Sequence, residues 1–282
     1  MTIIAFQGRR AAYSDMACRS YDPSAESLPC ETFADAIEAV RSGQADLGML
    51  ACENSLAGRV PDIHSLLPES GLSIVAEHFQ RVEHCLLVVP GTRIGQVRRV
   101  HSHAVALGQV RGLIRELEVV PVVENDTAGA AHLVADWSRP EDAAIASSLA
   151  GELYGLEVLR RNVEDESHNT TRFYVTAAKP RVPSADTPGL MTTFVFRVRN
   201  VPAALYKALG GFATNGVNMT KLESYMLKGS FSATQFLCDV EGHPEEVDLR
   251  RALEELSFFS HEVKILGVYP AAEFRLGQVQ AE

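Results

Sequence analysis

Residues 168–175 have the sequence His-Asn-Thr-Thr-Arg-Phe-Tyr-Val, and this stretch shows how the chain is divided. A polar loop turns there into an apolar run whose aromatic and β-branched side chains favour a strand. Residues 179–190 follow with three prolines and one glycine, a composition that blocks a continuous helix or strand. We therefore predict a first domain, residues 1–178, that ends with this strand, and a linker at residues 179–190. Side chains at such a loop-to-strand edge are often functional, because a rigid scaffold presents them.

The composition limits the classes of protein to which the chain can belong. Its 282 residues are 46% hydrophobic and carry a net charge of -10 at pH 7, which suits about two globular domains. The acidic charge argues against nucleic-acid and membrane partners. No apolar run approaches the ~20 residues that span a bilayer, and the N-terminus does not resemble a signal peptide. The five cysteines are scattered, without a Cys-x-x-Cys pair, so we expect reduced thiols and a cytoplasmic protein.

The first domain alternates short apolar runs with amphipathic helical patterns. Such units predict an α/β fold with a mostly parallel sheet and helices on both faces. Two extended runs between Ser73 and Val89, which we expect to pair antiparallel, separate a first series of units from a second. We therefore predict two lobes, the first of about residues 1–78 and 160–178 and the second of about residues 79–159. A ligand would bind in the cleft between such lobes, at the carboxyl ends of strands.

The second domain, residues 191–272, has a different pattern. Its apolar periodicity predicts the order β-α-β-β-α-β, which is a ferredoxin-like split βαβ module. Leu227–Ser230, with the sequence Leu-Lys-Gly-Ser, is the predicted hairpin turn between the second and third strands. Residues 273–282 are expected to be a frayed tail.

Three polar clusters follow predicted strands of the first domain. Glu53–Ser55 follow a buried strand, whereas His101–His103 and Asn125–Thr127 each precede a helix. Ser102 and Asp126 are candidate N-caps, and two helix N-termini beside one cleft can hold an anion without many basic side chains. Each cluster alone is also consistent with a cap or a turn, but their shared placement around one cleft favours a site.

The sequence lacks the motifs of several common catalytic sites. It has no serine-nucleophile elbow, no phosphate loop and no dinucleotide-binding glycine motif. His84 and Cys85 are adjacent in a predicted strand, where alternation directs them to opposite faces, so we expect core or surface roles for both. His101 and His103 have no third ligand nearby. We therefore predict neither a metal nor a cofactor.

These segments together resemble the prephenate dehydratases, which convert prephenate to phenylpyruvate, water and carbon dioxide. The resemblance extends over about residues 3–270 and is carried by five motifs in the family's order. They are Phe6–Gly8 with Ala12–Ser14, Cys52–Val60, His101–His103 with Ala106, Leu107 and Gln109, Thr127–Ala131, and Asn169–Phe173. The fold that the resemblance implies is a two-lobed, periplasmic-binding-protein-like catalytic domain.

The resemblance also implies a cofactor-free reaction and a set of site residues. Thr171 would donate a hydrogen bond to the leaving hydroxyl of prephenate, and the other catalytic candidates are Asn54, Ser102 and Glu53. The substrate-binding candidates are Gln109, Thr127, Asn125, Arg172 and Ser14. Arg172 would pair with a substrate carboxylate or brace the loop, and bracing is favoured.

The second domain resembles an ACT domain, the amino-acid-sensing unit of such dehydratases. Ala203-Ala204-Leu205 stands where the family has Gly-Ala-Leu, and Glu223-Ser224-Tyr225-Met226 where it has Glu-Ser-Arg-Pro. By resemblance, a phenylalanine site between the ACT domains of a homodimer or homotetramer would use Ala203, Ala204, Leu205, Glu223 and Ser224. Because both motifs depart from the family's pattern, the sensing of phenylalanine stays open.

Two alternatives stay open at this point. An arogenate or broad cyclohexadienyl dehydratase would act on the amino analogue of the same substrate, and the sequence does not distinguish the two. A non-catalytic small-acid binding and amino-acid-sensing protein would share the two-lobed fold. The presence of Thr171 together with Asn54 and Ser102 favours catalysis over binding alone.

Overall fold

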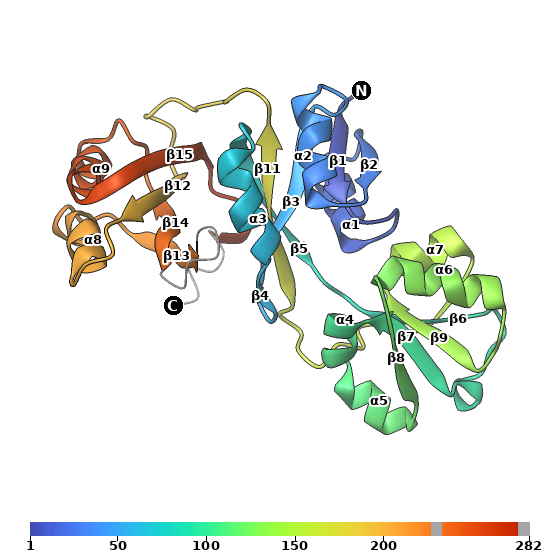
Figure 1. The fold of residues 1–282 in the computed structure, drawn as a ribbon. Coiled ribbons are helices and arrows are strands. Elements are labelled where there is room, and N and C mark those ends of the chain that lie inside the picture. The colour runs from blue at the N-terminus through green and yellow to red at the C-terminus, as the bar shows by residue number, and fades with distance from the viewer. Residues whose placement is uncertain (227–232, 276–282) are drawn as a thin grey trace. The chain divides into compact units, whose positions relative to one another are not determined.

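The structure, a computed structural model, describes residues 1–226 and 233–275 (Figure 1). The chain forms two compact units. Unit 1 comprises Met1–Val60 and Phe79–Phe173, and unit 2 comprises Pro61–His78 and Tyr174–Glu282. All candidate catalytic and substrate-binding residues belong to unit 1, and all candidate phenylalanine-sensing residues belong to unit 2. The chain is therefore an α/β protein with two β-sheets, and its two predicted sites can be described separately.

The first sheet of unit 1 is built on parallel strands. β1 (Ile3–Gln7) pairs in parallel with both β2 (Glu26–Cys30) and β3 (Leu47–Asn54). The start of β11 (Thr170–Ala177) lies next to β3, and β4 (Gly58–Arg59) forms a hairpin with it. The connecting helices are α1 (Tyr13–Tyr21) and α2 (Phe33–Arg41). This arrangement places the end of β3 beside the start of β11.

The second sheet of unit 1 is mixed, with the strand order β10-β6-β9-β7-β8. β7 pairs in parallel with β8 and β9, whereas β6 pairs antiparallel with β9 and β10. The strands are β6 (Cys85–Val88), β7 (Arg99–His103), β8 (Val120–Glu124), β9 (Asp142–Ala146) and β10 (Glu157–Arg160). Its helices are α4 (Ala104–Gly108), α5 (Arg111–Leu117), α6 (Thr127–Trp137) and α7 (Ser148–Tyr154).

The predicted antiparallel pairing between residues 73 and 89 is wrong. β5 (Ser73–Arg81) belongs to the sheet that contains β11, whereas β6 belongs to the other sheet. The segment Val82–His84 between them is not a strand and carries the chain from one sheet to the other. It is bonded to the returning segment, because the Val82 N–H donates to the Asn169 carbonyl and the Val163 N–H donates to the His84 carbonyl. The two crossing segments therefore pair with each other.

Unit 2 contains β12, α8, β13, β14, α9 and β15 in the predicted order β-α-β-β-α-β. Their bounds are β12 (Leu190–Val198), α8 (Ala204–Thr214), β13 (Met219–Met226), β14 (Ala233–Glu241), α9 (Val247–Phe259) and β15 (Ser260–Pro270). The strands form an antiparallel sheet in the order β13-β14-β12-β15, which is the arrangement of a split βαβ module. The predicted hairpin turn at Leu227–Ser230 lies outside the described residues.

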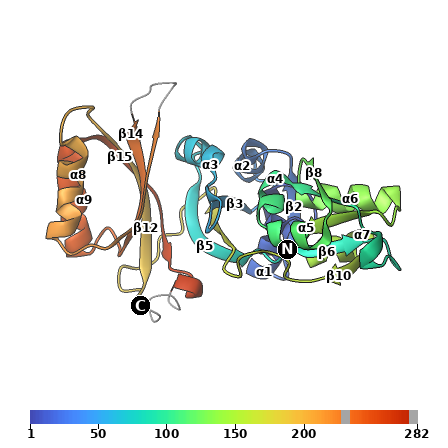
Figure 2. The same cartoon turned by 90° about the horizontal axis from the view of Figure 1, so that it is seen from below.

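The two faces of this sheet differ in character. α8 and α9 lie together on one side (Figure 2) and bury an apolar core of phenylalanine and leucine side chains, including Phe194, Phe212 and Leu256. On the opposite face, the same strands carry polar side chains that are buried or, in the case of Glu223, half-buried. We call these residues the polar face of unit 2: Thr193, Lys221, Glu223, Gln235 and Asp239. A buried polar face needs internal partners for each group, and it finds them within unit 2.

Short elements and the end of the described chain complete unit 2. α3 (Pro61–Leu66) and a 3₁₀ turn at Leu67–Glu69 precede β5, and β15 pairs in parallel with β5 at Gly267 and Ile74. Arg275 forms two hydrogen bonds, of 2.6 and 3.0 Å, with the buried carboxylate of Glu77. The predicted fraying of the tail is therefore wrong for its first residues. None of the helices in residues 1–226 and 233–275 has the length and apolar content needed to span a bilayer.

Candidate active site

Thr171 and Asn54 meet at the edge where β3 ends and β11 begins. The amide nitrogen of Asn54 lies 3.0 Å from the Thr171 hydroxyl oxygen and 2.8 Å from the side-chain oxygen of Asn169. Thr171 and Asn54 are both half-buried, and Asn169 is fully buried. The structure therefore brings together the two residues that the sequence placed first.

The orientation of the Asn54 amide is fixed by the backbone that follows it. Its oxygen accepts hydrogen bonds from the N–H groups of Leu56, at 3.0 Å, and Ala57, at 2.8 Å. Backbone N–H groups can only donate, so the NH₂ group of Asn54 must face Thr171. The Thr171 oxygen then accepts this bond, and the hydroxyl proton of Thr171 is left to donate to a ligand.

The contact continues away from Thr171 through buried neutral side chains. Asn169 donates to the Gln109 side-chain oxygen at 2.9 Å, and the same oxygen lies 2.9 Å from Nε2 of His84. Nδ1 of His84 lies 2.8 Å from the Tyr13 hydroxyl. We call this series the Thr171 chain: Tyr13, His84, Gln109, Asn169, Asn54 and Thr171. Gln109 was predicted as a site residue, whereas the places of Tyr13, His84 and Asn169 in the series were not.

The prediction that His84 lies in a strand is wrong, whereas its predicted core position fits its burial. His84 lies in the crossing segment, before β6 begins at Cys85, so strand alternation does not apply to it. Burial lowers the pKa of His84, and burial raises the pKa of Tyr13 well above its ordinary value. Both groups therefore favour their neutral forms. A sequence signal was available, since Gln80, Arg81, Glu83 and His84 make the stretch before the apolar run Cys85–Val89 polar.

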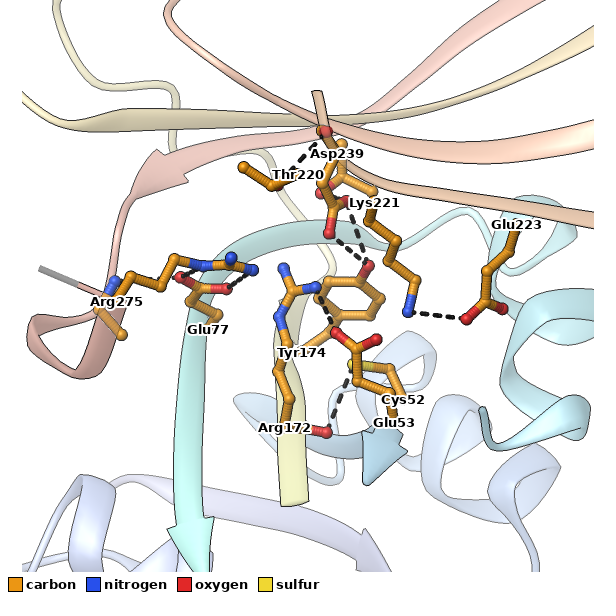
Figure 3. Close-up of polar contacts among 12 residues, drawn as sticks. Cys52, Glu53, Glu77, Arg172, Tyr174, Thr220, Lys221, Glu223, Asp239 and Arg275 are labelled. Atoms are coloured by element: carbon orange, nitrogen blue, oxygen red, sulfur yellow. Dashed lines mark hydrogen bonds and ion pairs between the residues drawn. The ribbon is translucent and has the colours of Figure 1, made fainter. Parts of the chain in front are cut away.

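Glu53 and Arg172 form an ion pair beside this series. Figure 3 shows the Arg172 guanidinium directed at the Glu53 carboxylate, at 2.8 Å. The Arg172 side chain is only 2% exposed, and its backbone carbonyl accepts from the Cys52 thiol at 3.3 Å. Of the two predicted roles for Arg172, this geometry supports bracing of the strand edge. The Glu53 carboxylate is held by that pair.

Ser102 has a different role from the predicted one. It lies within β7, which extends to His103, and its hydroxyl donates to the Ile145 carbonyl at 2.6 Å. The N-cap of α4 is His103, whose ring accepts from the Val105 N–H. The prediction of Ser102 as an N-cap is therefore wrong, because parallel pairing with β8 keeps Ser102 and His103 in the strand.

The cluster at residues 125–127 keeps its predicted capping role. Asp126 is the N-cap of α6 and accepts from the Gly129 N–H at 2.6 Å. Its carboxylate, with Arg9 at 3.4 Å, already supplies negative charge to this helix end. Thr127 begins α6, and Asn125 is exposed before it. The predicted anion site at this terminus is therefore occupied by a carboxylate of the protein itself.

A crevice of about 410 Å³ adjoins the Thr171 chain. Its volume lies in the usual range of small-molecule sites. It is lined by Leu56, Ala57, Val105, Gly108, Gln109, Arg111, Asp165 and Glu166. Two of these residues orient Asn54 through their N–H groups, and Gln109 belongs to the chain itself. The sequence analysis expected helix N-termini to supply the positive potential for an anion, whereas in this crevice the positive charge comes from Arg111. Ser14, a predicted substrate-binding residue, follows Tyr13 in the first turn of α1.

Beside this crevice runs a more apolar groove of about 590 Å³, which shares Gly108 and Arg111 with it. The other lining residues are Ala104, Leu107, Ile114, Arg115, Pro121 and Val123. Within the part of the chain that the structure describes, no three His, Cys, Asp or Glu side chains are grouped so as to hold a metal ion.

The structure separates the predicted sensing residues of unit 2 within one chain. Ala204 lines a cavity of about 380 Å³ together with Arg199, Lys207 and Phe258, whereas Glu223 belongs to the polar face. The Glu223 carboxylate lies 2.8 Å from His64 and 3.2 Å from Lys221, and Figure 3 shows Lys221 directed at it. Ala203 and Leu205 flank Ala204 at the start of α8, and Ser224 lies on the helix-covered face.

The sequence and the fold were compared with known proteins. Residues 4–181 match the sequence model of the prephenate dehydratase family. A relative from Komagataeibacter europaeus, named bifunctional N-acyl-homoserine lactone acylase/prephenate dehydratase, is 67% identical over 97% of both chains. Arogenate dehydratase 2 of Petunia hybrida is 36% identical over 95% of this chain and 71% of its own. The solved prephenate dehydratase from Arthrobacter aurescens in complex with L-Phe has a TM-score of 0.88 at 26% identity, covering 99% of this chain and 97% of its own.

The fold and these matches define a carbon–oxygen lyase of the α/β class. The chain belongs to the prephenate dehydratase family. Its reaction is the dehydration and decarboxylation of prephenate to phenylpyruvate, a step of phenylalanine biosynthesis.

Proposed function

We propose that Thr171 is the group that assists departure of the ring hydroxyl from prephenate. The reaction breaks the bond between the ring and its carboxylate, which leaves as carbon dioxide. The electron pair of that bond enters the ring, the C4–O bond breaks, and the hydroxide takes up one proton to become water. A hydrogen bond to this oxygen therefore strengthens as the reaction proceeds, which is the condition for catalysis.

The observation that carries this role is the direction of the Asn54 bond. Because Asn54 donates to Thr171, the Thr171 oxygen accepts a bond while its own proton is free for the leaving oxygen. A threonine hydroxyl is a weak acid, so it shares its proton instead of transferring it. Assistance of this kind is typically worth ~10²–10⁴-fold, and orientation of the substrate supplies more.

Gln109 and Arg111 would hold the substrate beside Thr171. The Gln109 oxygen is taken by Asn169 and His84, which leaves its NH₂ group for a substrate oxygen in the crevice. Arg111 lines the same crevice, and a guanidinium matches the two oxygens of a carboxylate. Two fixed donors and one cation suit a small dicarboxylic acid.

The test of the Thr171 role is a pair of substitutions that differ by one hydroxyl. Thr171→Val removes the hydroxyl and keeps the volume, and we expect kcat to fall by on the order of 100-fold or more. Thr171→Ser restores the hydroxyl and should recover much of the rate. Phenylpyruvate absorbance measures both rates, and thermal unfolding checks that both variants fold. A Thr171→Val enzyme with near wild-type kcat would exclude the role.

Prephenate and arogenate differ only in their side chain, and we propose that prephenate is the preferred substrate. Several relatives are named arogenate dehydratases, and arogenate carries an ammonium group where prephenate carries a keto group. The match to the prephenate dehydratase family supports prephenate, whereas the exposed carboxylate of Glu166 in the crevice would attract the ammonium of arogenate as a second substrate. We therefore expect kcat/KM for arogenate, but not for prephenate, to fall in Glu166→Gln. Wild-type kcat/KM on both substrates ranks them directly.

We propose that the βαββαβ module of unit 2 is an ACT domain and that it binds phenylalanine in a homodimer or homotetramer. The solved relative that contains L-Phe supports the ligand. Ala204 and Glu223 are separated within one chain. This suits a phenylalanine site that combines the Ala204 region of one copy with the Glu223 region of a second copy. Calorimetric titration with phenylalanine tests the ligand, and light scattering with and without it tests the assembly. A flat titration would exclude phenylalanine as the effector.

A second activity, release of the acyl chain from N-acyl-homoserine lactones, is favoured by the relative that is 67% identical and carries that name. The 590 Å³ groove beside the crevice is mostly apolar and would hold an acyl chain. Mass spectrometry of released fatty acid tests this activity. Val123→Asp places a charge in the groove at an exposed position, and it should lower acyl release while prephenate turnover is kept. Absence of release by the wild-type protein would exclude the activity.

A further inference from the structure

His84 joins the two sheets of unit 1 through its imidazole ring. One ring nitrogen contacts Tyr13, at the start of α1 on the first sheet, and the other contacts Gln109, at the end of α4 on the second. Its backbone is also held by the returning segment, since the His84 N–H donates to the Glu164 carboxylate at 2.8 Å and the His84 carbonyl accepts from the Val163 N–H. The residue is 1% exposed. A buried ring with both nitrogens engaged is a fixed part of the site.

The protons along the Thr171 chain have directions that follow from the backbone. The NH₂ group of Asn54 donates to the Asn169 oxygen, so Asn169 must present its own NH₂ group to Gln109. The atom of Gln109 that receives this bond is its oxygen. That same oxygen faces Nε2 of His84, and an acceptor requires a donor opposite it. Nε2 of His84 therefore carries a proton.

The other ring nitrogen of His84, Nδ1, faces the Tyr13 hydroxyl. Burial favours the neutral imidazole by lowering the pKa of His84, and a neutral ring with a proton on Nε2 has a lone pair on Nδ1. The Tyr13 hydroxyl oxygen lies 2.8 Å from Nδ1 and 3.0 Å from the Glu83 carbonyl oxygen, so its one proton faces these two acceptors. The titratable groups around the ring are Tyr13, Cys85 and the carboxylates of Glu83 and Glu164.

We propose that His84 is a positioning residue for the dehydration, and that the Gln109 oxygen selects its Nε2–H tautomer. The His84 proton holds the Gln109 oxygen inward, which turns the Gln109 NH₂ group toward the crevice. The same oxygen holds Asn169, and Asn169 holds Asn54 in the orientation that leaves the Thr171 proton free. His84 does not touch the substrate. This inference rests on the proposed role of Thr171.

The first test compares two replacements of His84 in the full-length enzyme. His84→Leu removes both ring nitrogens, and His84→Gln keeps an N–H donor near the place of Nε2. We expect kcat of His84→Leu to fall by on the order of 100-fold through misplacement of the donors, with a much smaller change in KM. His84→Gln should recover most of the loss. A His84→Leu enzyme with wild-type kcat, or a His84→Gln enzyme as impaired as His84→Leu, would overturn the proposal.

A measurement on the wild-type protein does not depend on the folding of any variant. Nitrogen-15 NMR of the histidine side chains distinguishes the two neutral tautomers, and the His84 signals are assigned by their loss in His84→Gln. The proposal requires a protonated Nε2 and a bare Nδ1 at neutral pH. A protonated Nδ1 would overturn it, because the Gln109 oxygen would then face no donor on the ring.

A double substitution separates this inference from the proposed role of Thr171. If His84 acts through Thr171, then adding His84→Leu to Thr171→Val should cause little further loss of kcat. A further loss as large as in the wild-type background would overturn the inference and leave the Thr171 role standing. If Thr171→Val alone retains wild-type kcat, the proposed role of Thr171 fails, and with it the inference.

Discussion

The two units contain buried polar networks of opposite kinds. In unit 1 the Thr171 chain consists of hydroxyls, amides and a neutral imidazole. The polar face of unit 2 includes charged groups: Lys221 lies 3.2 Å from Glu223, and the Asp239 carboxylate accepts bonds from Tyr174 and Thr193. Figure 3 shows the Tyr174 hydroxyl directed at Asp239.

The difference follows from what each network has to do. Neutral donors and acceptors can be fixed in direction at a small desolvation cost, whereas a buried charge is costly unless it is fully paired. A directional neutral network suits a site that must leave one proton free beside an anionic substrate. A charged network suits a structural layer, since removal of one partner leaves the others buried without compensation. We therefore expect changes in unit 1 to act on catalysis and changes in unit 2 to act on stability.

The largest expected effect comes from replacing one hydrogen-bond donor of the Thr171 chain with an acceptor. Asn54→Asp keeps the shape and the acceptor for the Leu56 and Ala57 N–H groups, but it loses the donor to Thr171. We expect kcat to fall by on the order of 10²–10³-fold, with some loss of thermal stability because the new carboxylate faces the Asn169 oxygen. The matched control is Asn215→Asp in unit 2, which removes the donor to the Gly211 carbonyl and should leave kcat unchanged. Equal losses of kcat in the two variants would contradict the division of roles.

The corresponding change in unit 2 removes a buried carboxylate. Asp239→Ala leaves the Tyr174 and Thr193 hydroxyls without this acceptor, and we expect the free energy of unfolding to fall by about 3 kcal/mol. Urea denaturation measures the loss. The folded fraction should keep the kcat of the wild-type enzyme. A loss below about 1 kcal/mol is within the range of one ordinary hydrogen bond. Such a loss would show that the polar face contributes little to the stability of the fold.

Substrate binding offers a smaller effect within unit 1. Arg111→Ala removes the guanidinium from the crevice, and we expect KM for prephenate to rise about tenfold, equivalent to about 1.4 kcal/mol, with a smaller change in kcat. Arg115→Ala is the matched control, because Arg115 lies one turn further along α5 and lines the neighbouring groove. Initial-rate kinetics measure both variants. If both substitutions raise KM equally, the increase reflects the loss of positive surface charge and not the loss of a specific contact between Arg111 and prephenate.

The lowered pKa of His84 predicts how stability depends on pH. Burial keeps the folded state from taking up the proton that the unfolded state accepts below a pH of ~6.5. The folded protein should therefore lose stability as the pH falls from ~6.5 toward the folded-state pKa, by at most about 1.4 kcal/mol per pH unit from this group. His84→Gln should lose less over the same range, as measured by urea denaturation at several pH values. Parallel curves for the two proteins would contradict the prediction.

The sequence predicted the parts of the site that depend on local pattern. Thr171, Asn54 and Gln109 lie next to element ends that periodicity can locate, and β3 and β11 bring the first two together. The role of His84 depends on where β5 stops pairing, and that is decided by neighbours far along the chain. Ser102 was misplaced for the same reason, because pairing with Val123 on β8 keeps it in a strand where local pattern predicted a helix cap. Tertiary pairing overrides local preference at such boundaries.

The smallest predicted effect concerns the start of α8, where unit 2 departs from the family's glycine. Ala203 has φ +62°, in the left-handed region that costs an L-residue about 1 kcal/mol or more. Ala203→Gly should therefore raise the free energy of unfolding, by about 0.5 kcal/mol after the greater freedom of unfolded glycine is subtracted. Ala204→Gly is the matched control, because Ala204 is helical and loses about 0.5–1 kcal/mol on the same substitution. Opposite signs one residue apart would establish that backbone strain, and not side-chain contact, is the cost of the alanine, whereas equal signs would contradict it.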